Sequence, residues 1–274
     1  MSEREAAPDF NAEGTALHTV LAPLNDDALR ASTQFKDWTI EDIITHLFLW
    51  NEAALLTLTN PLAFQTLVAK VMSRLGVGDD HRALQRAWLT ETHPGAAGPS
   101  LVEQWYKSHR HCAAGFGEAD PDQRVAWFGP PMTARSKIIA RQMECWAHGQ
   151  AIFDHLGMAR ADTDRLYNIA HLGVTTYGFA FRNRSLAPPT PKPEITLTAP
   201  SGTLWHWNTS QDDNHVRGSA TAFCQVVCQT RALADTDLTI TGDNAKAWTA
   251  IAQCFAGPPH PPPVPGSRYR RSTA

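Results

Sequence analysis

Glu144 and His148 are the residues of this sequence whose types and spacing could do metal chemistry. They are four positions apart, so on a helix their side chains project from one face, one turn from each other. A carboxylate oxygen and an imidazole nitrogen placed in this way can bind one cation together. Because such pairs also occur by chance on solvated helix surfaces, the pair by itself predicts only half of a metal site.

His46 is the candidate for a further ligand. It lies beside an apolar stripe in a segment predicted to be helical over residues 39–58, with Thr39 as the expected N-cap. A histidine in this setting is more often a buried, hydrogen-bonded side chain than a ligand. Metal sites in helical bundles, however, draw their ligands from facing helices. We therefore expect His46 to face Glu144 and His148.

Three other histidines are weaker candidates. His155 follows His148 by seven positions and shares nearly the same helix face, so it could be a fourth ligand. We favour the alternative, a polar group that suits the last turn of a helix. His109 and His111 are two positions apart and point to different sides of a helix, so we expect them on the surface.

Cysteine usage argues against a disulfide framework or a thiolate zinc site. The chain has five cysteines, an odd number, and no Cys-x-x-Cys motif. Cys224 and Cys228 are four positions apart and could share a metal, but two small apolar residues on a buried helix face are the better interpretation. Reduced thiols fit a cytoplasmic protein.

Composition limits the possible partners. The 274 residues are 43% hydrophobic, which is enough for one large or two ordinary domains, and the net charge of −3 provides no basic surface for nucleic acid or anionic membranes. The N-terminus shows no secretory signal, and no apolar run is long enough to span a membrane. We expect a cytoplasmic protein with a small-molecule substrate, no nucleic acid partner and no membrane partner.

Helical periodicity dominates the first part of the chain and strand signals appear only later. The helices expected before residue 157 cover residues 9–24, 39–58 and 61–75, a segment that begins with Ser100 as N-cap, and residues 133–156. After a helix over residues 164–182, alternating residues predict a hairpin of strands 194–199 and 203–207. Residues 216–219 lead into a helix through Arg231, and a strand at 238–240 and a helix at 244–255 follow. Helices first and an α+β segment later indicate two domains.

Three runs of residues resemble a known metal-binding bundle. They are Trp38-Thr39-Ile40 with His46-Leu47, Trp50-Asn51-Glu52-Ala53-Ala54-Leu55, and Glu144-Cys145-Trp146-Ala147-His148-Gly149-Gln150. These runs resemble the DinB-like superfamily, and within it the mycothiol-dependent maleylpyruvate isomerase family. The resemblance implies that His46, Glu144 and His148 bind a divalent metal, usually zinc, in an all-α four-helix bundle.

The later part of the chain fits the same resemblance. Its α+β layout is similar to the sterol-carrier-like C-terminal domain of the isomerase family. The implied organisation is a DinB-like bundle over residues 5–160, a smaller α+β domain over residues 164–257 and a flexible Pro-rich tail over residues 258–274.

Arg231 matches a functionally important arginine of that second domain. The resemblance implies that its guanidinium is a catalytic group, which could clamp a carboxylate of the substrate or thiol bidentately. An exposed arginine at a helix end is an equally good interpretation of the sequence. In the family pattern an acidic residue follows the Glu-x-x-x-His motif by three positions, where this chain has Ala151. The resemblance therefore implies that a carboxylate near the ligands is missing.

Two imidazoles and one carboxylate suit Zn²⁺, although Fe²⁺, Ni²⁺ or Co²⁺ use the same donors. Three protein ligands leave a position at which a thiol, a water or a substrate carbonyl can be activated. The family resemblance implies a mycothiol-like thiol that is transferred to a small electrophile or isomerises it. One alternative is a metal enzyme without a thiol, such as a lyase, hydrolase or cyclase, and another is a non-catalytic metal- or ligand-binding protein. The sequence specifies neither the substrate nor the oligomeric state.

Overall fold

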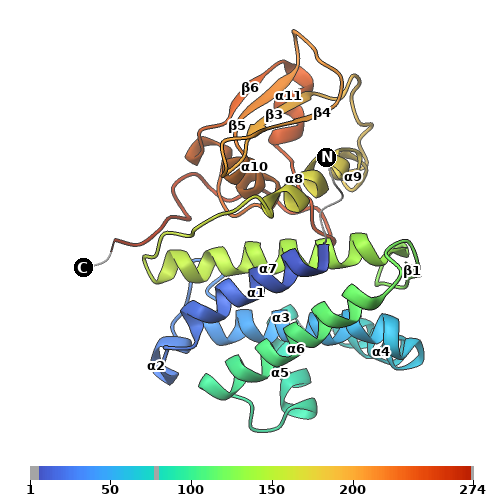
Figure 1. Ribbon diagram of the computed structural model, residues 1–274, viewed down its shortest axis with the longest axis vertical. Helices are drawn as coiled ribbons and strands as arrows, with labels where there is room; N and C mark the ends of the chain where they lie inside the picture. The colour runs from blue at the N-terminus through green and yellow to red at the C-terminus, as the bar shows by residue number, and fades with distance from the viewer. Residues whose placement is uncertain (1–5, 77–79, 273–274) are drawn as a thin grey trace. The chain divides into compact units, whose positions relative to one another are not determined.

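Helices build the first of two units into which the chain divides, Met1–Ile152 and Phe153–Ala274 (Figure 1). The computed structural model describes residues 6–76 and 80–272. The helices and short strands of the first unit are α1 (Ala6–Leu21), α2 (Asp26–Leu29), α3 (Ile40–Thr59), α4 (Pro61–Gly76), α5 (His81–Thr92), α6 (Gly98–Glu118), β1 (Arg124–Val125), β2 (Met132–Thr133) and α7 (Ala134–His155). Helix α7 crosses the division between the units.

Helix α3 is the central element of the first unit, and it packs against α4, α5 and α6. Its predicted N-terminus is confirmed, because the Thr39 hydroxyl accepts from the Asp42 amide and the Asp42 carboxylate accepts from the Thr39 amide. The carboxylate of Asp42 also receives two hydrogen bonds from Arg86 of α5, at 2.6 and 2.9 Å. These hydrogen bonds determine the residue at which α3 begins. They therefore also determine the position of His46 along the helix.

The structure corrects three expectations for the first unit. Helix α6 begins at Gly98 rather than at Ser100, because Pro99 suits the first turn and the Gly98 amide donates to Glu41 at 2.7 Å. The polar segment before it contains an unpredicted helix, α5, which Asp80 caps. His109 is fully buried rather than exposed, with Nε2 3.0 Å from the Phe10 carbonyl oxygen of α1.

The second unit combines helices with a four-stranded sheet. Its elements are α8 (Leu166–Thr175), α9 (Tyr177–Arg182), β3 (Glu194–Thr198), β4 (Leu204–Trp207), β5 (His215–Ser219), α10 (Ala220–Val227), η1 (Leu233–Asp235), β6 (Thr239–Thr241) and α11 (Asp243–Thr249). The sheet has the order β4-β3-β5-β6. The predicted hairpin is confirmed as antiparallel β3 and β4, whereas β3 and β5 are parallel.

The end of α10 and the hydrogen bonding of the C-terminal segment differ from expectation. Helix α10 ends at Val227 and not at Arg231, because Gln229 takes a left-handed conformation with φ of 56° and stops the helix. The Pro-rich segment after residue 257 forms no helix or strand in its described part, to residue 272, as expected of an extended tail. It is hydrogen-bonded to the second unit, because Arg268 donates to the Gln229 carbonyl and the Gly266 amide donates to Asp235.

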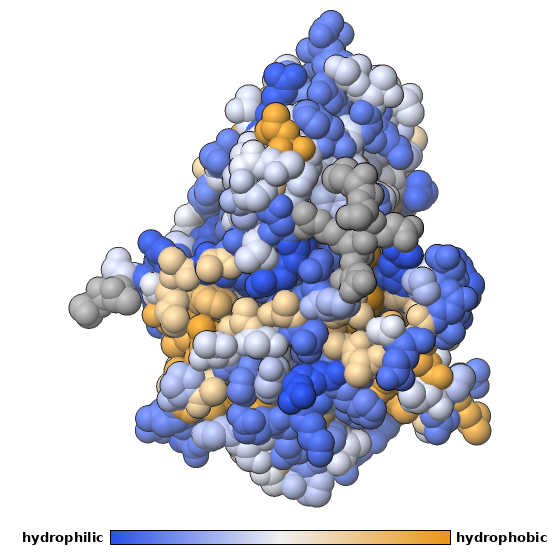
Figure 2. All heavy atoms as spheres, viewed as in Figure 1, coloured by the Kyte–Doolittle hydropathy of each residue, from blue (hydrophilic) through white to orange (hydrophobic). Residues whose placement is uncertain are grey.

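The surface in view is largely hydrophilic, with smaller apolar areas between the polar ones (Figure 2). Within residues 6–76 and 80–272, no helix is long and apolar enough to cross a membrane.

Candidate metal centre

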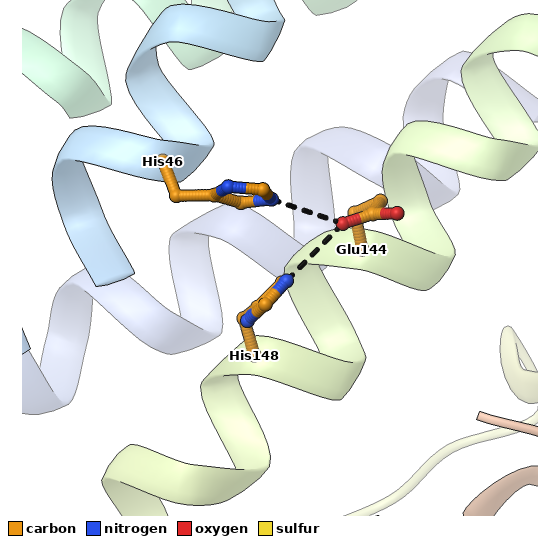
Figure 3. A group of neighbouring side chains, drawn as sticks. All are labelled: His46, Glu144 and His148. Atoms are coloured by element: carbon orange, nitrogen blue, oxygen red, sulfur yellow. Dashed lines mark hydrogen bonds and ion pairs between the residues drawn. The ribbon is translucent and has the colours of Figure 1, made fainter. Parts of the chain in front are cut away.

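Figure 3 shows the three predicted ligands side by side, His46 from α3 and Glu144 and His148 from α7. Nε2 of His46 and Nε2 of His148 each lie 3.2 Å from the same carboxylate oxygen, Oε2 of Glu144. One donor atom from each residue falls within 4.8 Å of the other two. The helical spacing of Glu144 and His148 accounts for one side of this triangle, and the packing of α3 beside α7 supplies the other two.

Burial and the neighbouring charges determine the protonation states of His46 and Glu144. The side chains of His46 and His148 are 13% exposed and that of Glu144 is 25% exposed. Burial, with repulsion from His148, lowers the pKa of His46 to about 4. Burial alone would raise the pKa of Glu144, but the hydrogen bonds and charges of the two histidines bring it well below its ordinary value. A neutral imidazole and an ionised carboxylate are the forms that bind metals.

The donor arrangement fits a divalent cation. At bond lengths of about 2.0–2.2 Å, a tetrahedral metal holds neighbouring donors roughly 3.3–3.6 Å apart. The two nitrogen–oxygen distances of 3.2 Å are close to that range, so little movement of His46, Glu144 or His148 is needed. The donor set and the spacing therefore suit Zn²⁺ or a similar ion.

Aromatic side chains from the connection before α3 surround the two imidazoles. The ring of Trp38 is nearly parallel to that of His148, at 6° and 6.1 Å, and Phe35 meets the same imidazole edge-on at 4.9 Å. A tight turn presents both rings, with Lys36 and Asp37 at φ of 53° and 56°. An apolar surrounding of this kind lowers the local dielectric and strengthens the electrostatic interactions of the site.

Trp50 determines which nitrogen of His46 carries the proton. Its indole N–H is 3.2 Å from Nδ1 of His46, and an indole can only donate. Neutral His46 therefore has its proton on Nε2 and donates to Glu144. Ligation through Nε2 requires the other tautomer, so the hydrogen bond from Trp50 favours the metal-free form of His46.

Arg141 holds the two ligand-bearing helices together. It precedes Glu144 by one turn, is 3% exposed, and donates across to Leu47 O and Asn51 Oδ1 of α3 at 3.3 and 3.1 Å. Sequence reasoning did not identify Arg141. The sequence does contain a signal for it, because Arg141 is a charged residue on the same helix face as Glu144 and His148. A charged side chain is costly to bury there unless it has a hydrogen-bond partner.

His148 lacks the second hydrogen bond that metal-binding histidines usually make. Within the described part of the chain, its buried Nδ1 has no hydrogen-bond partner. This observation agrees with the implication drawn from Ala151 that a nearby carboxylate is missing.

Arg231 is paired with a carboxylate of its own unit. Arg231 belongs to the second unit, where its two terminal nitrogens donate to both oxygens of Asp154 at 2.7 and 2.6 Å. The two side chains are 11% and 4% exposed, so Arg231 is not a solvated helix-end residue. His155 also lies in the second unit and is not one of the three clustered ligands.

The chain matches a known family model and two proteins of similar sequence. Residues 10–153 match the family model described as mycothiol maleylpyruvate isomerase N-terminal domain. Two proteins of Mycobacterium tuberculosis, the uncharacterized proteins Rv0036c and MT0041, are each 37% identical to this chain over 253 residues, covering 92% of this chain and 95% of theirs.

A solved structure shares the fold. A crystal structure of a mutant mycothiol-dependent maleylpyruvate isomerase superimposes with a TM-score of 0.52 at 16% sequence identity, covering 86% of this chain and 92% of that one. The family match over residues 10–153, more than half of the chain, shows that the chain belongs to the mycothiol-dependent maleylpyruvate isomerase family.

Proposed function

We propose that this protein is a metal-dependent enzyme that activates a mycothiol-like thiol for transfer to, or isomerisation of, a small electrophile. The observation that carries the proposal is the convergence of His46, Glu144 and His148, with both imidazole nitrogens 3.2 Å from one carboxylate oxygen. Family membership supports the thiol, because mycothiol appears in the description of the matched family and in the name of the solved relative.

In this proposal the three side chains hold one divalent cation, Zn²⁺ by preference, with Fe²⁺, Ni²⁺ or Co²⁺ as other possibilities. A bound cation with an open position would lower the pKa of a thiol and so supply a nucleophile at neutral pH. Arg141 keeps α7 beside α3, and Phe35 and Trp38 limit the access of water to the imidazoles.

The fold assignment is part of the proposal in its finer form. We infer that the first unit is a DinB-like bundle and that the second is a sterol-carrier-like domain, in a cytoplasmic protein. The helical content of the first unit and the mixed sheet with the order β4-β3-β5-β6 in the second support this assignment.

Arg231 is proposed as the substrate-binding arginine of the second unit. Its guanidinium is planar and suited to a carboxylate, and Asp154 already holds it by two hydrogen bonds. A substrate carboxylate would have to compete with Asp154 or use the guanidinium donors that Asp154 and the Thr230 carbonyl do not occupy. Substitution of Arg231 by Lys should then raise KM more than it lowers kcat, whereas a purely structural arginine would leave KM unchanged.

The first test is the metal content of the purified protein. We expect one equivalent of metal in the wild type and less than about a tenth of that in His46→Ala, Glu144→Ala and His148→Ala, because each removes one of three ligands. The matched control is His111→Ala, which removes an exposed histidine of the same unit. Elemental analysis with native mass spectrometry measures the metal content. Full metal retention in a variant that carries all three substitutions would contradict the assignment of His46, Glu144 and His148 as ligands.

The second test separates the proposed reaction from its alternatives. Maleylpyruvate, the substrate in the name of the solved relative, is supplied to the metal-loaded protein with and without mycothiol. Turnover only with mycothiol supports the proposal, and turnover without any thiol indicates direct activation of water or substrate. A tightly bound metal with no turnover of a panel of thiol-reactive electrophiles would favour a binding protein.

A further inference from the structure

Lys137 is a buried lysine on the helix face that carries the proposed ligands. Lys137, Arg141, Glu144 and His148 follow one another at intervals of four, three and four residues, so they form a stripe along α7. Lys137 is 1% exposed. At a rise of 1.5 Å per residue, it lies about 10 Å before Glu144 along the helix axis.

The Lys137 amine has an aromatic partner and, in the described part of the chain, no acidic one. Its Nζ lies 3.2 Å from the centre of the Trp127 ring. Among the residues that the structure describes, nothing accepts a hydrogen bond from it or forms an ion pair with it. A buried lysine without an anion is expected to lose its proton. Burial, with repulsion from Arg141, lowers the pKa of Lys137 to about 6, and Glu144 acts in the opposite direction.

The aromatic residues around Lys137 connect it to the metal site. Trp127 lies 5.9 Å from Trp50 of α3 and is stacked on Phe64 of α4 at 5.8 Å. Trp50 in turn is hydrogen-bonded to His46. The neighbours from α3, α4 and the connection before β2 are therefore uncharged, and the charged groups that act on Lys137 are Arg141 and Glu144 of its own helix.

The charges along this face would no longer balance once a divalent cation is bound. Arg141 donates to the neutral oxygens of Leu47 and Asn51, and within the described residues Glu144 is the carboxylate that acts on both Lys137 and Arg141. With Lys137 neutral, the single charges of Arg141 and Glu144 cancel. A divalent cation at the ligands would add two further positive charges. An excess of one sign in a buried place is costly, and an anionic ligand would relieve it.

We propose that Lys137 is a specificity-determining residue that recognises a carboxylate of the small molecule bound at the His46, Glu144 and His148 site. The amine takes one proton from solvent when the carboxylate arrives, and the resulting ammonium pairs with it. The ligand class is a small acid that carries this carboxylate in addition to the group held by His46, Glu144 and His148. This inference rests on the proposed function for the position of the ligand.

The experiment is calorimetric titration of the full-length, zinc-loaded protein with succinate, glutarate and adipate, with succinamide as the uncharged comparison. Titrations in Tris and in HEPES, whose ionisation enthalpies differ, count the protons taken up. We expect the wild type to bind at least one dicarboxylate with uptake of up to one proton. Affinity should fall with rising pH by up to about tenfold per unit above the free-amine pKa, because the bound form keeps a proton that the free amine has lost.

Two variants make the test specific. Lys137→Met should bind the dicarboxylate roughly 10- to 100-fold more weakly and lose the Lys137-linked proton uptake. Lys137→Arg should bind without that uptake, because its guanidinium stays charged. Lys107→Met, which removes an exposed lysine of α6, is the matched control and should behave as the wild type. Metal content and thermal unfolding of each variant verify that the site and the fold are intact.

The outcomes distinguish this inference from the proposed function. If Lys137→Met binds every dicarboxylate as well as the wild type does, including the case in which neither binds, the inference is overturned. That result can coincide with full mycothiol-dependent turnover, which would leave the proposed function standing. Conversely, binding that depends on Lys137 in a protein without turnover would support the inference and count against the proposed reaction.

Discussion

Individual side chains decide whether His46 can serve as a ligand. Its Nε2 is already directed at Glu144, and burial keeps the imidazole neutral, with a pKa of about 4. The hydrogen bond from Trp50 to Nδ1 acts against ligation, because it stabilises the tautomer that has its proton on Nε2. The affinity for metal is thus a balance between a well-placed donor and a neighbour that holds the proton on the wrong nitrogen.

Trp50→Phe should therefore bind zinc more tightly. It removes the indole donor but keeps an aromatic ring against Trp127 and Phe128. Loss of one neutral hydrogen bond of about 1 kcal/mol would raise the affinity roughly fivefold. Competition with a fluorescent zinc chelator measures the dissociation constant.

A matched control exists in the second unit. The indole of Trp207 donates to Nδ1 of His171 at 3.2 Å, the same contact in a place without clustered ligands. Trp207→Phe should leave zinc affinity unchanged. Equal or weaker zinc binding by Trp50→Phe would show that the tautomer of His46 does not limit ligation.

At the scale of elements, the ends of helices position the site. Helix α3 begins at a capping box, and Asp42 of that box is also tied to Arg86 of α5. His46 lies less than two turns further along the same helix. The start of α3 could be predicted from Thr39 and Asp42, because a capping box joins residues that are three positions apart. The contact between Asp42 and Arg86 of α5 could not be predicted from a local pattern, because the two residues are 44 positions apart.

Asp42→Ala should destabilise the first unit by about 2 kcal/mol. The substitution removes the acceptor for the Thr39 amide and leaves Arg86 without its carboxylate. Arg86 is 57% exposed, so water compensates for much of the lost ion pair. Urea unfolding followed by circular dichroism gives the free energy of unfolding.

The control for Asp42→Ala is Asp27→Ala, which breaks a surface ion pair whose aspartate is 92% exposed. It should change the free energy of unfolding by less than about 0.5 kcal/mol. If the two substitutions cost the same, the start of α3 is not a particular source of stability.

At the scale of the whole molecule, two units have separate internal supports. The first depends on α3 and its neighbours, and the second contains the bidentate pair of Arg231 and Asp154 beside a four-stranded sheet. Both partners of that pair are nearly buried, so losing Arg231 removes two charge-assisted hydrogen bonds from a carboxylate that is 4% exposed. Arg231 therefore has a structural task within its own unit, in addition to the substrate-binding task proposed for it.

Arg231→Met should destabilise the second unit by about 3–5 kcal/mol, the usual cost of breaking a buried ion pair from one side. Hydrogen exchange followed by mass spectrometry should show faster exchange in β3, β5 and α10 and little change in α3. Arg217→Met is the control, because Arg217 is 55% exposed and its nitrogen is 4.0 Å from Glu194. An unchanged exchange rate in the second unit would show that the pair is not needed for its stability.

The sequence by itself determined the features that depend on near neighbours. The i,i+4 spacing of Glu144 and His148 implies a shared helix face, Thr39 and Asp42 mark a helix start, and alternating residues predict the hairpin of β3 and β4. Each of these depends on contacts across a few residues, or across one tight turn, which a local pattern can encode.

Only the tertiary structure decided the features that depend on packing between distant segments. Of these features, the facing of His46 toward Glu144 was predicted, from the rule that metal sites in bundles draw ligands from facing helices and from the family resemblance. The structure alone showed the hydrogen bond from Trp50 to His46, the bridge from Arg141 to α3, the contact of the buried Lys137 amine with the Trp127 ring and the pairing of Arg231 with Asp154. A side chain's burial, partner and charge state depend on which helices pack around it, and no short stretch of sequence contains that information.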